Sequence, residues 1–290
     1  MFSGSYVAIV TPMRADGALD FDAWSRLLEF HVDAGTRGIV VGGTTGESAT
    51  LSDAELRELV VRAREQLNGR VQLLAGAGTS STATSVERAA WLGDLGVDAL
   101  LVVTPAYNKP TQDGLYLHFE AVAAASPVPV VLYNVPGRTA VDMLPQTVAR
   151  LARLPRIVAL KEAVADLGRI RELAATCGTG FDVLSGDDAT TREAILAGAK
   201  GVISVTANVA PQRMSDLVHA ALEGRVAEAA ALDASLASLH ERLFLEASPI
   251  PVKWVLQQMS LIGAGIRLPL TPLSAKFHER LRDAMRTAGI

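Results

Sequence analysis

The sequence is poor in cysteine and in aromatic residues. Its one cysteine, Cys177, excludes an intrachain disulfide and fits a reducing compartment; with no histidine near it, we interpret it as structural. Phe, Trp and Tyr make up 5% of the chain, and no Lys or Arg cluster stands out at a formal net charge of −4. These features argue against base stacking and a basic binding face, so we expect no nucleic-acid partner.

Long apolar runs are absent too. No stretch reaches the roughly 18 uninterrupted residues that a membrane span needs, and no basic segment precedes the apolar run in MFSGSYVAIVTPM at the N-terminus. We therefore expect neither a secretory signal nor a membrane partner, and we expect a cytoplasmic location.

Short apolar runs are what the sequence has in abundance. Hydrophobic residues make up 49% of the chain, which is enough for a large core. Eight runs have the near-continuous Val, Ile, Leu and Ala composition that is typical of parallel strands buried on both faces. The predicted strands are 5–11, 38–43, 71–77, 99–105, 129–135, 157–163, 181–187 and 201–207.

Amphipathic, helix-like segments fill the intervals between these runs. Ser52 and Glu55 have capping-box spacing, which predicts the start of one helix. Gly35, Gly69 and Gly96 lie just beyond three predicted helix ends. The pattern therefore repeats as one strand followed by one helix.

Eight such units predict an α/β fold, a (β/α)8 TIM barrel, over residues 1–224. A doubly wound open sheet is the alternative, but GAG at 76–78 lacks the third glycine of a dinucleotide loop, so we interpret it as a tight turn. Residues 225–290 read as purely helical and are too few for a large independent domain. We expect them to form a C-terminal helical extension packed on the catalytic barrel.

Active sites of such barrels lie at the C-terminal ends of the strands. Polar residues at or just beyond the predicted strand ends are therefore candidates for the site. They are Thr11, Thr44, Thr45, Glu47, Ser48, Thr104, Tyr107, Asn108, Lys109, Tyr133, Asn134, Arg138, Lys161, Glu162, Asp187, Asp188, Ser204 and Thr206.

Lys161 differs from the other candidates because it lies inside its strand, in IVALKEA. Alternate strand residues point inward, so we expect Ile157, Ala159 and Lys161 to share the interior face. Poor hydration there favours the neutral amine, which attacks carbonyl carbon to form a Schiff base. The alternative is a structural lysine paired with an acid such as Glu162.

GGTTGES (42–48) follows the second predicted strand. Its glycines let the backbone approach a ligand closely, and its amides can cradle a small carboxylate. No Gly-Lys-Ser/Thr ends it, so it is not a phosphate-binding P-loop. The alternative is a polar strand-to-helix turn.

Two further loops carry candidate groups. In YNVPGRT, Tyr133 can shuttle protons and Arg138 can clamp a carboxylate, unless it is merely a surface arginine. In AYNKPTQDG, Tyr107 is either a second phenol near the site or part of the loop packing.

These motifs together, with AIVTP, ISVTANVAP, SPIPVKW and LPLT, make nearly the whole chain similar to the dihydrodipicolinate synthase family. The resemblance implies a TIM-barrel lyase in which Lys161 forms a Schiff base with pyruvate. The resulting enamine attacks the aldehyde of L-aspartate 4-semialdehyde, and cyclisation releases 4-hydroxy-tetrahydrodipicolinate. This is the first committed step of diaminopimelate and lysine biosynthesis.

The resemblance also implies roles for individual residues. Tyr133, Thr45 and Tyr107 match the family's proton relay, in which Tyr107 reaches into the neighbouring subunit's site. Thr44 and Thr45 stand where the pyruvate carboxylate is bound. The expected partner is therefore a second copy of the chain, in a homodimer or a homotetramer.

Further positions line the implied pocket. Arg138 matches the arginine that holds the semialdehyde carboxylate, and Gly186 and Ile203 match positions near the lysine. No metal or organic cofactor is implied, and the five histidines have no ligand spacing.

The sequence departs from the family pattern where sensitive members bind the feedback inhibitor lysine. Those members carry Asn, Glu, Tyr, His and His at the positions that correspond to Ser80, Thr84, Ala106, Asp53 and Leu56. Without these partners a buried lysine ligand is left unpaired, so we expect weak or absent inhibition.

Three other functions compete with this interpretation. N-acetylneuraminate lyases and 2-keto-3-deoxy sugar acid aldolases share the lysine and tyrosine, but they lack the equivalent of Arg138. A pyridoxal-phosphate barrel needs a phosphate nest where SGDD (185–188) offers two acids. A non-catalytic binding barrel has no need for Tyr133, Thr45 and Lys161 together.

Overall fold

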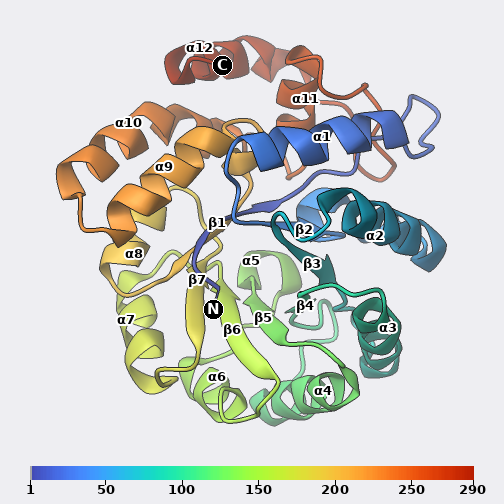
Figure 1. Cartoon of the computed structure of the whole chain (residues 1–290), viewed down its shortest axis with the longest axis vertical. Coiled ribbons are helices and arrows are strands. Elements are labelled where there is room, and N and C mark those ends of the chain that lie inside the picture. Colours follow the sequence, from blue (N-terminus) through green and yellow to red (C-terminus); the bar gives the residue numbers. More distant parts are fainter. Residues whose placement is uncertain (1) are drawn as a thin grey trace.

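The computed structural model describes residues 2–290 and forms a closed barrel of eight parallel strands, in which β1 pairs with β8 (Figure 1). The predicted TIM barrel and its eight strands are thereby confirmed. The strands are β1 (Gly4–Ala8), β2 (Gly38–Val41), β3 (Gln72–Gly76), β4 (Ala99–Val103), β5 (Val130–Asn134), β6 (Ile157–Glu162), β7 (Asp182–Ser185) and β8 (Gly201–Ser204). Every strand ends before its predicted C-terminal bound, because the apolar pattern continues into the loops that follow.

Helices surround the strands as an outer ring (Figure 1). They are α1 (Phe21–Asp33), α2 (Asp53–Leu67), α3 (Thr82–Asp94), α4 (Gln112–Ala125), α5 (Pro136–Thr139), α6 (Pro145–Leu151), α7 (Leu167–Thr176), α8 (Thr191–Leu196) and α9 (Pro211–Leu222), with 3-10 turns η1 (Thr44–Gly46) and η2 (Thr206–Asn208). The capping box of Ser52 and Glu55 begins α2 as predicted. Gly35, Gly69 and Gly96 have positive φ angles of 70°, 78° and 78° beyond the helix ends, as expected.

The C-terminal segment adds α10 (Val226–Arg242), α11 (Ile250–Gln258), a 3-10 turn (η3, Ala275–Phe277) and α12 (His278–Ala288). In Figure 1, α10 lies beside α9, and α11 and α12 lie beyond α1. Leu236, Leu239 and Leu281 are fully buried in the same hydrophobic cluster as the barrel helices. The segment therefore packs on the barrel and shares its outer core.

The strands separate two apolar cores. The outer core lies between strands and helices, and the smaller inner core fills the barrel. The inner core consists of Phe2, Tyr6, Ala8, Val40, Leu74, Ala99, Leu101, Val131, Tyr133, Ala159, Leu184 and Ile203.

One prediction about β6 is wrong. Ala159 lies in the inner core as expected, but Ile157 belongs to the outer core. Val130 pairs with Ile157 and Val131 with Ala159, so β6 carries one extra residue, Val158, opposite β5. This bulge reverses the alternation of side chains near the start of the strand.

Among the helices of residues 2–290, none is long and apolar enough to cross a membrane.

Candidate active site

A cavity of about 490 Å³ opens at the C-terminal ends of β2 to β5. Its wall includes Thr44 from the loop after β2, Tyr133 at the end of β5, and Arg138 from α5. Three of the predicted site residues thus line one space, although they come from different elements.

Lys161 lies against Tyr133 in the barrel interior. The two residues face each other across β5 and β6, and the Lys161 Nζ atom is 4.4 Å from the centroid of the Tyr133 ring. Lys161 is 5% exposed. Within residues 2–290 it forms no ion pair, and its neighbour Glu162 pairs with Arg169 instead. The alternative in which Lys161 pairs with Glu162 is therefore wrong.

The residues next to Lys161 leave room for its side chain. A Cβ atom added to Gly186 would lie 3.1 Å from the Lys161 Cε atom and 3.0 Å from the Cβ atom of Ala163. Ile203 is buried in the inner core, as is Ala159. Both predicted pocket-lining positions are therefore in the barrel interior, and Gly186 lies directly against the lysine.

Close backbone packing shapes the glycine-rich loop. Gly42 has a φ of 64°, and a Cβ atom there would lie 2.4 Å from the Cδ1 atom of Leu56. The loop continues into η1, where Thr44 lines the cavity, whereas Thr45 is 4% exposed and is not part of the cavity wall. The Thr11 hydroxyl donates to the Gly46 carbonyl at 2.7 Å and ties the loop to the segment that follows β1.

Glu47, a strand-end candidate, is engaged in a buried ion pair. Its Oε1 atom lies 2.5 Å from the Lys253 Nζ atom in α11, and its Oε2 atom accepts from the Arg267 amide at 3.1 Å. Burial lowers the pKa of Lys253, and the Glu47 carboxylate opposes that shift. The C-terminal segment is thereby bonded to the glycine-rich loop.

Sequence reasoning missed Lys253. Its signal was available, since SPIPVKW places a lysine within an apolar stretch, as IVALKEA does for Lys161. What the sequence does not reveal is its partner, which lies 206 positions earlier in the chain.

Arg138 and Tyr107 differ in their position relative to the cavity, because Arg138 is part of its wall and Tyr107 is not. The exposed Arg138 lines the cavity, and its Nη2 atom donates to the Ser248 carbonyl at 3.2 Å. Tyr107 is 93% exposed, has a φ of 75° and is not part of the cavity wall. Such a φ is strained for an aromatic residue. The single chain does not bring Tyr107 together with Tyr133.

The side chains that could bind a metal ion or act as a thiol nucleophile were also compared. Residues 2–290 hold no group of His, Cys, Asp and Glu side chains placed to bind a metal ion. Cys177 follows α7, and burial raises the pKa of its thiol, which is the opposite of what a nucleophile requires.

Comparison with known proteins gives a consistent result. The model of the dihydrodipicolinate synthetase family matches residues 1–288. The 4-hydroxy-tetrahydrodipicolinate synthase of Stutzerimonas stutzeri (strain A1501) is 55% identical over 100% of this chain and 99% of its own. The crystal structure of the chloride-inhibited dihydrodipicolinate synthase of Acinetobacter baumannii, complexed with pyruvate, is 47% identical with a TM-score of 0.99 and covers 100% of both chains. A monomeric dihydrodipicolinate synthase variant is 40% identical with a TM-score of 0.97, over 99% of this chain and 97% of its own.

Proposed function

The chain belongs to the dihydrodipicolinate synthetase family and is a lyase, and from this premise we propose that it condenses pyruvate with L-aspartate 4-semialdehyde. The product is 4-hydroxy-tetrahydrodipicolinate. The observation that carries the proposal is the buried Lys161 amine, 4.4 Å from the ring of Tyr133, which lines one cavity together with Arg138.

In the proposed reaction, Lys161 is the nucleophile. Its amine adds to the keto carbon of pyruvate, and loss of water leaves a protonated imine. The imine accepts the electron pair that remains when a methyl proton leaves, so an enamine forms. The enamine attacks the aldehyde carbon of the semialdehyde. The semialdehyde's amino group then displaces Lys161 and closes the ring.

Protons must reach and leave these intermediates, and the ring of Tyr133 lies against Lys161. We assign the relay to Tyr133 with a hydroxyl of the glycine-rich loop. The family pattern favours Thr45, whereas the cavity wall favours Thr44; both hydroxyls are also suited to the pyruvate carboxylate. Gly186 keeps the space beside Lys161 open, and we assign Ile203 to the lining of the same pocket.

Tyr107 completes the relay only if a second subunit supplies it. Its side chain is 93% exposed and held at a strained φ of 75°, which suits a residue inserted into a neighbour. We therefore propose a homo-oligomer, a dimer or a tetramer, in which Tyr107 crosses the interface.

The C-terminal extension has a supporting part in this proposal. Residues 1–224 carry the catalytic groups, and residues 225–290 hold the glycine-rich loop through Lys253 and Arg138 through the Ser248 carbonyl.

A coupled assay tests the proposed function. The purified protein is mixed with pyruvate and L-aspartate 4-semialdehyde, and the product is followed through a reductase that consumes NADPH. Turnover supports the synthase. Pyruvate trapped on Lys161 by borohydride without turnover would favour another pyruvate aldolase, such as N-acetylneuraminate lyase or a 2-keto-3-deoxy sugar acid aldolase.

Replacing Arg138 with Ala is expected to raise the KM for the semialdehyde by about 10- to 100-fold, since a charge-assisted hydrogen bond contributes roughly 1.5–3 kcal/mol. Trapping of pyruvate should be unchanged, because Arg138 lies at the cavity wall and Lys161 in the interior. Arg156→Ala, at an exposed position before β6, is the matched control. An unchanged KM in Arg138→Ala would remove the arginine from the proposal.

L-lysine is expected to leave turnover unchanged at concentrations that inhibit sensitive relatives. Asp53 is already paired with Arg88 at 2.7 Å, and the Ser80 hydroxyl donates to the Ala106 carbonyl at 2.9 Å. Leu56 is buried against Gly42 and offers no polar atom. Initial rates with and without lysine, at ionic strength matched with sodium chloride, measure the effect. Saturable inhibition by lysine alone would contradict the prediction.

A further inference from the structure

The residues that follow Tyr133 and Lys161 in their strands are also paired with each other. Tyr133 is opposite Lys161, and Asn134 is opposite Glu162. Because strand side chains alternate, the first pair points into the barrel and the second toward the surrounding helices. Asn134 and Glu162 are 0% and 1% exposed. A buried polar pair thus lies on the reverse face of the two strands that carry the lysine and the tyrosine.

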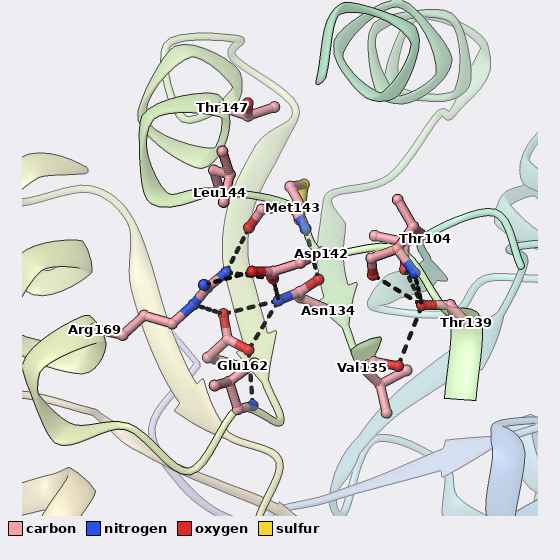
Figure 2. A network of polar contacts seen from close by, with 12 residues as sticks. Thr104, Asn134, Val135, Thr139, Asp142, Met143, Leu144, Thr147, Glu162 and Arg169 are labelled. Carbon is pink, nitrogen blue, oxygen red and sulfur yellow. Dashed lines mark hydrogen bonds and ion pairs between the residues drawn. The ribbon is translucent and has the colours of Figure 1, made fainter. Parts of the chain in front are cut away.

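Every polar atom of the Asn134 side chain is used (Figure 2). Its Nδ2 atom donates to Glu162 Oε1 at 3.0 Å and Oε2 at 3.2 Å, and to Asp142 Oδ1 at 2.8 Å. Its Oδ1 atom accepts from the Met143 amide at 3.0 Å. The donors face carboxylates and the acceptor faces an N–H group, so the amide has one satisfied orientation.

Glu162 is bonded on its remaining sides by Arg169 and by the backbone. Arg169 Nε donates to Glu162 Oε2 at 2.7 Å, and the Val164 amide donates to Oε1 at 2.9 Å (Figure 2). The guanidinium also bonds both oxygens of Asp142, at 2.9 and 3.0 Å, and the Met143 carbonyl at 2.6 Å. Burial raises the pKa of the Glu162 carboxyl, and Arg169 opposes that shift. The group joins β5, β6, α7 and the segment after α5 in one network.

The bulge at Val158 makes the pairing of β6 with β5 dependent on contacts such as those of this network. A strand with one extra residue can be paired in more than one way, and a shift of one residue exchanges the two faces. Such a shift in β6 would place Glu162 in the barrel interior and Lys161 outside. The Asn134–Glu162 contact lies at the end of β6, beyond the bulge and next to Lys161, and fixes the pairing there.

We propose that Asn134 and Glu162 are positioning residues, which hold Lys161 and Tyr133 side by side in the barrel interior. The inference rests on the proposed function, because it assumes that Lys161 forms the Schiff base. Neither residue contacts the reacting atoms. Their effect on the rate comes from the direction of the two side chains that do.

The test measures Schiff-base formation directly. Folded wild-type protein, Asn134→Ala and Glu162→Gln are incubated with pyruvate, quenched with borohydride at successive times, and the mass increase on Lys161 is quantified. Asp233→Asn is the matched control, because Asp233 pairs with Arg192 at 3.2 Å between α8 and α10, with half-buried side chains. Melting curves establish the folded fraction of each variant.

Trapping and kcat are expected to fall by about 10- to 100-fold in Asn134→Ala, the effect of misplacing a reacting group by about 1 Å. Glu162→Gln retains an acceptor for the Asn134 amide and should lose less, while Asp233→Asn traps pyruvate at the wild-type rate. If Asn134→Ala does not fold, the test depends on Glu162→Gln alone. A reduced trapping rate in that variant supports the inference, and an unchanged rate overturns it.

A wild-type trapping rate in the folded variants would overturn the inference and leave the proposed function standing. Absence of trapping in the wild-type protein would instead remove the proposed function.

Discussion

Replacing Lys161 with Ala should abolish both turnover and the attachment of pyruvate. The fall in kcat is expected to be on the order of 10⁴-fold or more, the scale seen when a covalent nucleophile is removed. Among residues 2–290 the other buried lysine, Lys253, is held by Glu47 in an ion pair of 2.5 Å and is not expected to take its place. The coupled assay measures turnover, and borohydride trapping with mass spectrometry measures attachment.

The fold should survive this substitution. Lys161 has no ion-pair partner within residues 2–290, so its removal leaves no buried charge unpaired. Lys200→Ala, which changes an exposed lysine before β8, is the control and should keep full activity. Pyruvate that is still trapped on the Lys161→Ala protein would show that the nucleophile lies elsewhere.

Replacing Lys253 with Met should cause the largest loss of stability. The side chains of Glu47 and Lys253 are 1% and 5% exposed, so the substitution leaves a buried carboxylate without its cation. Breaking such a pair costs roughly 3–5 kcal/mol. For a domain of this size the melting temperature should fall by about 10 °C. Because Glu47 anchors the glycine-rich loop, the KM for pyruvate should rise as well.

Two controls separate the lost ion pair from the altered packing. In the double variant Glu47→Gln with Lys253→Met no charge remains buried, so its melting temperature should lie above that of Lys253→Met alone. Arg62→Ala breaks an exposed pair with Glu58, with side chains 48% and 49% exposed, and should cost less than about 1 kcal/mol. Equal melting temperatures for Lys253→Met and Arg62→Ala would contradict the prediction.

The predicted loss of stability in Lys253→Met depends on the Glu47–Lys253 ion pair, which no local sequence pattern predicts. In the sequence, Glu47 is an acid that follows a strand, and this position predicts that it belongs to the polar groups of the site. In the structure it holds the C-terminal segment to the barrel. Its partner lies 206 positions away, and which of the chain's many cations reaches it depends on how α11 packs.

The position of Lys161 could be predicted, because strand alternation and a lysine in an apolar run are local features. The face of β6 on which Ile157 lies could not be predicted, because the bulge depends on how the residues of β6 pair with those of β5. Tyr107 is a further limit, because a single chain leaves its side chain in solvent, and the role that we propose for it requires a second copy.

The sequence by itself determined the eight strand–helix units, the helix caps, and the lysine, tyrosine and glycine-rich loop at the strand ends, since each follows from spacing over a few residues. Closure of the barrel brought Thr44, Tyr133 and Arg138 around one cavity. Tertiary structure alone decided the partners of the buried charges, Glu47 with Lys253 and Glu162 with Arg169. A buried charge requires a partner of opposite charge. The sequence does not show which residue that partner is, because long-range packing determines which charged side chains meet.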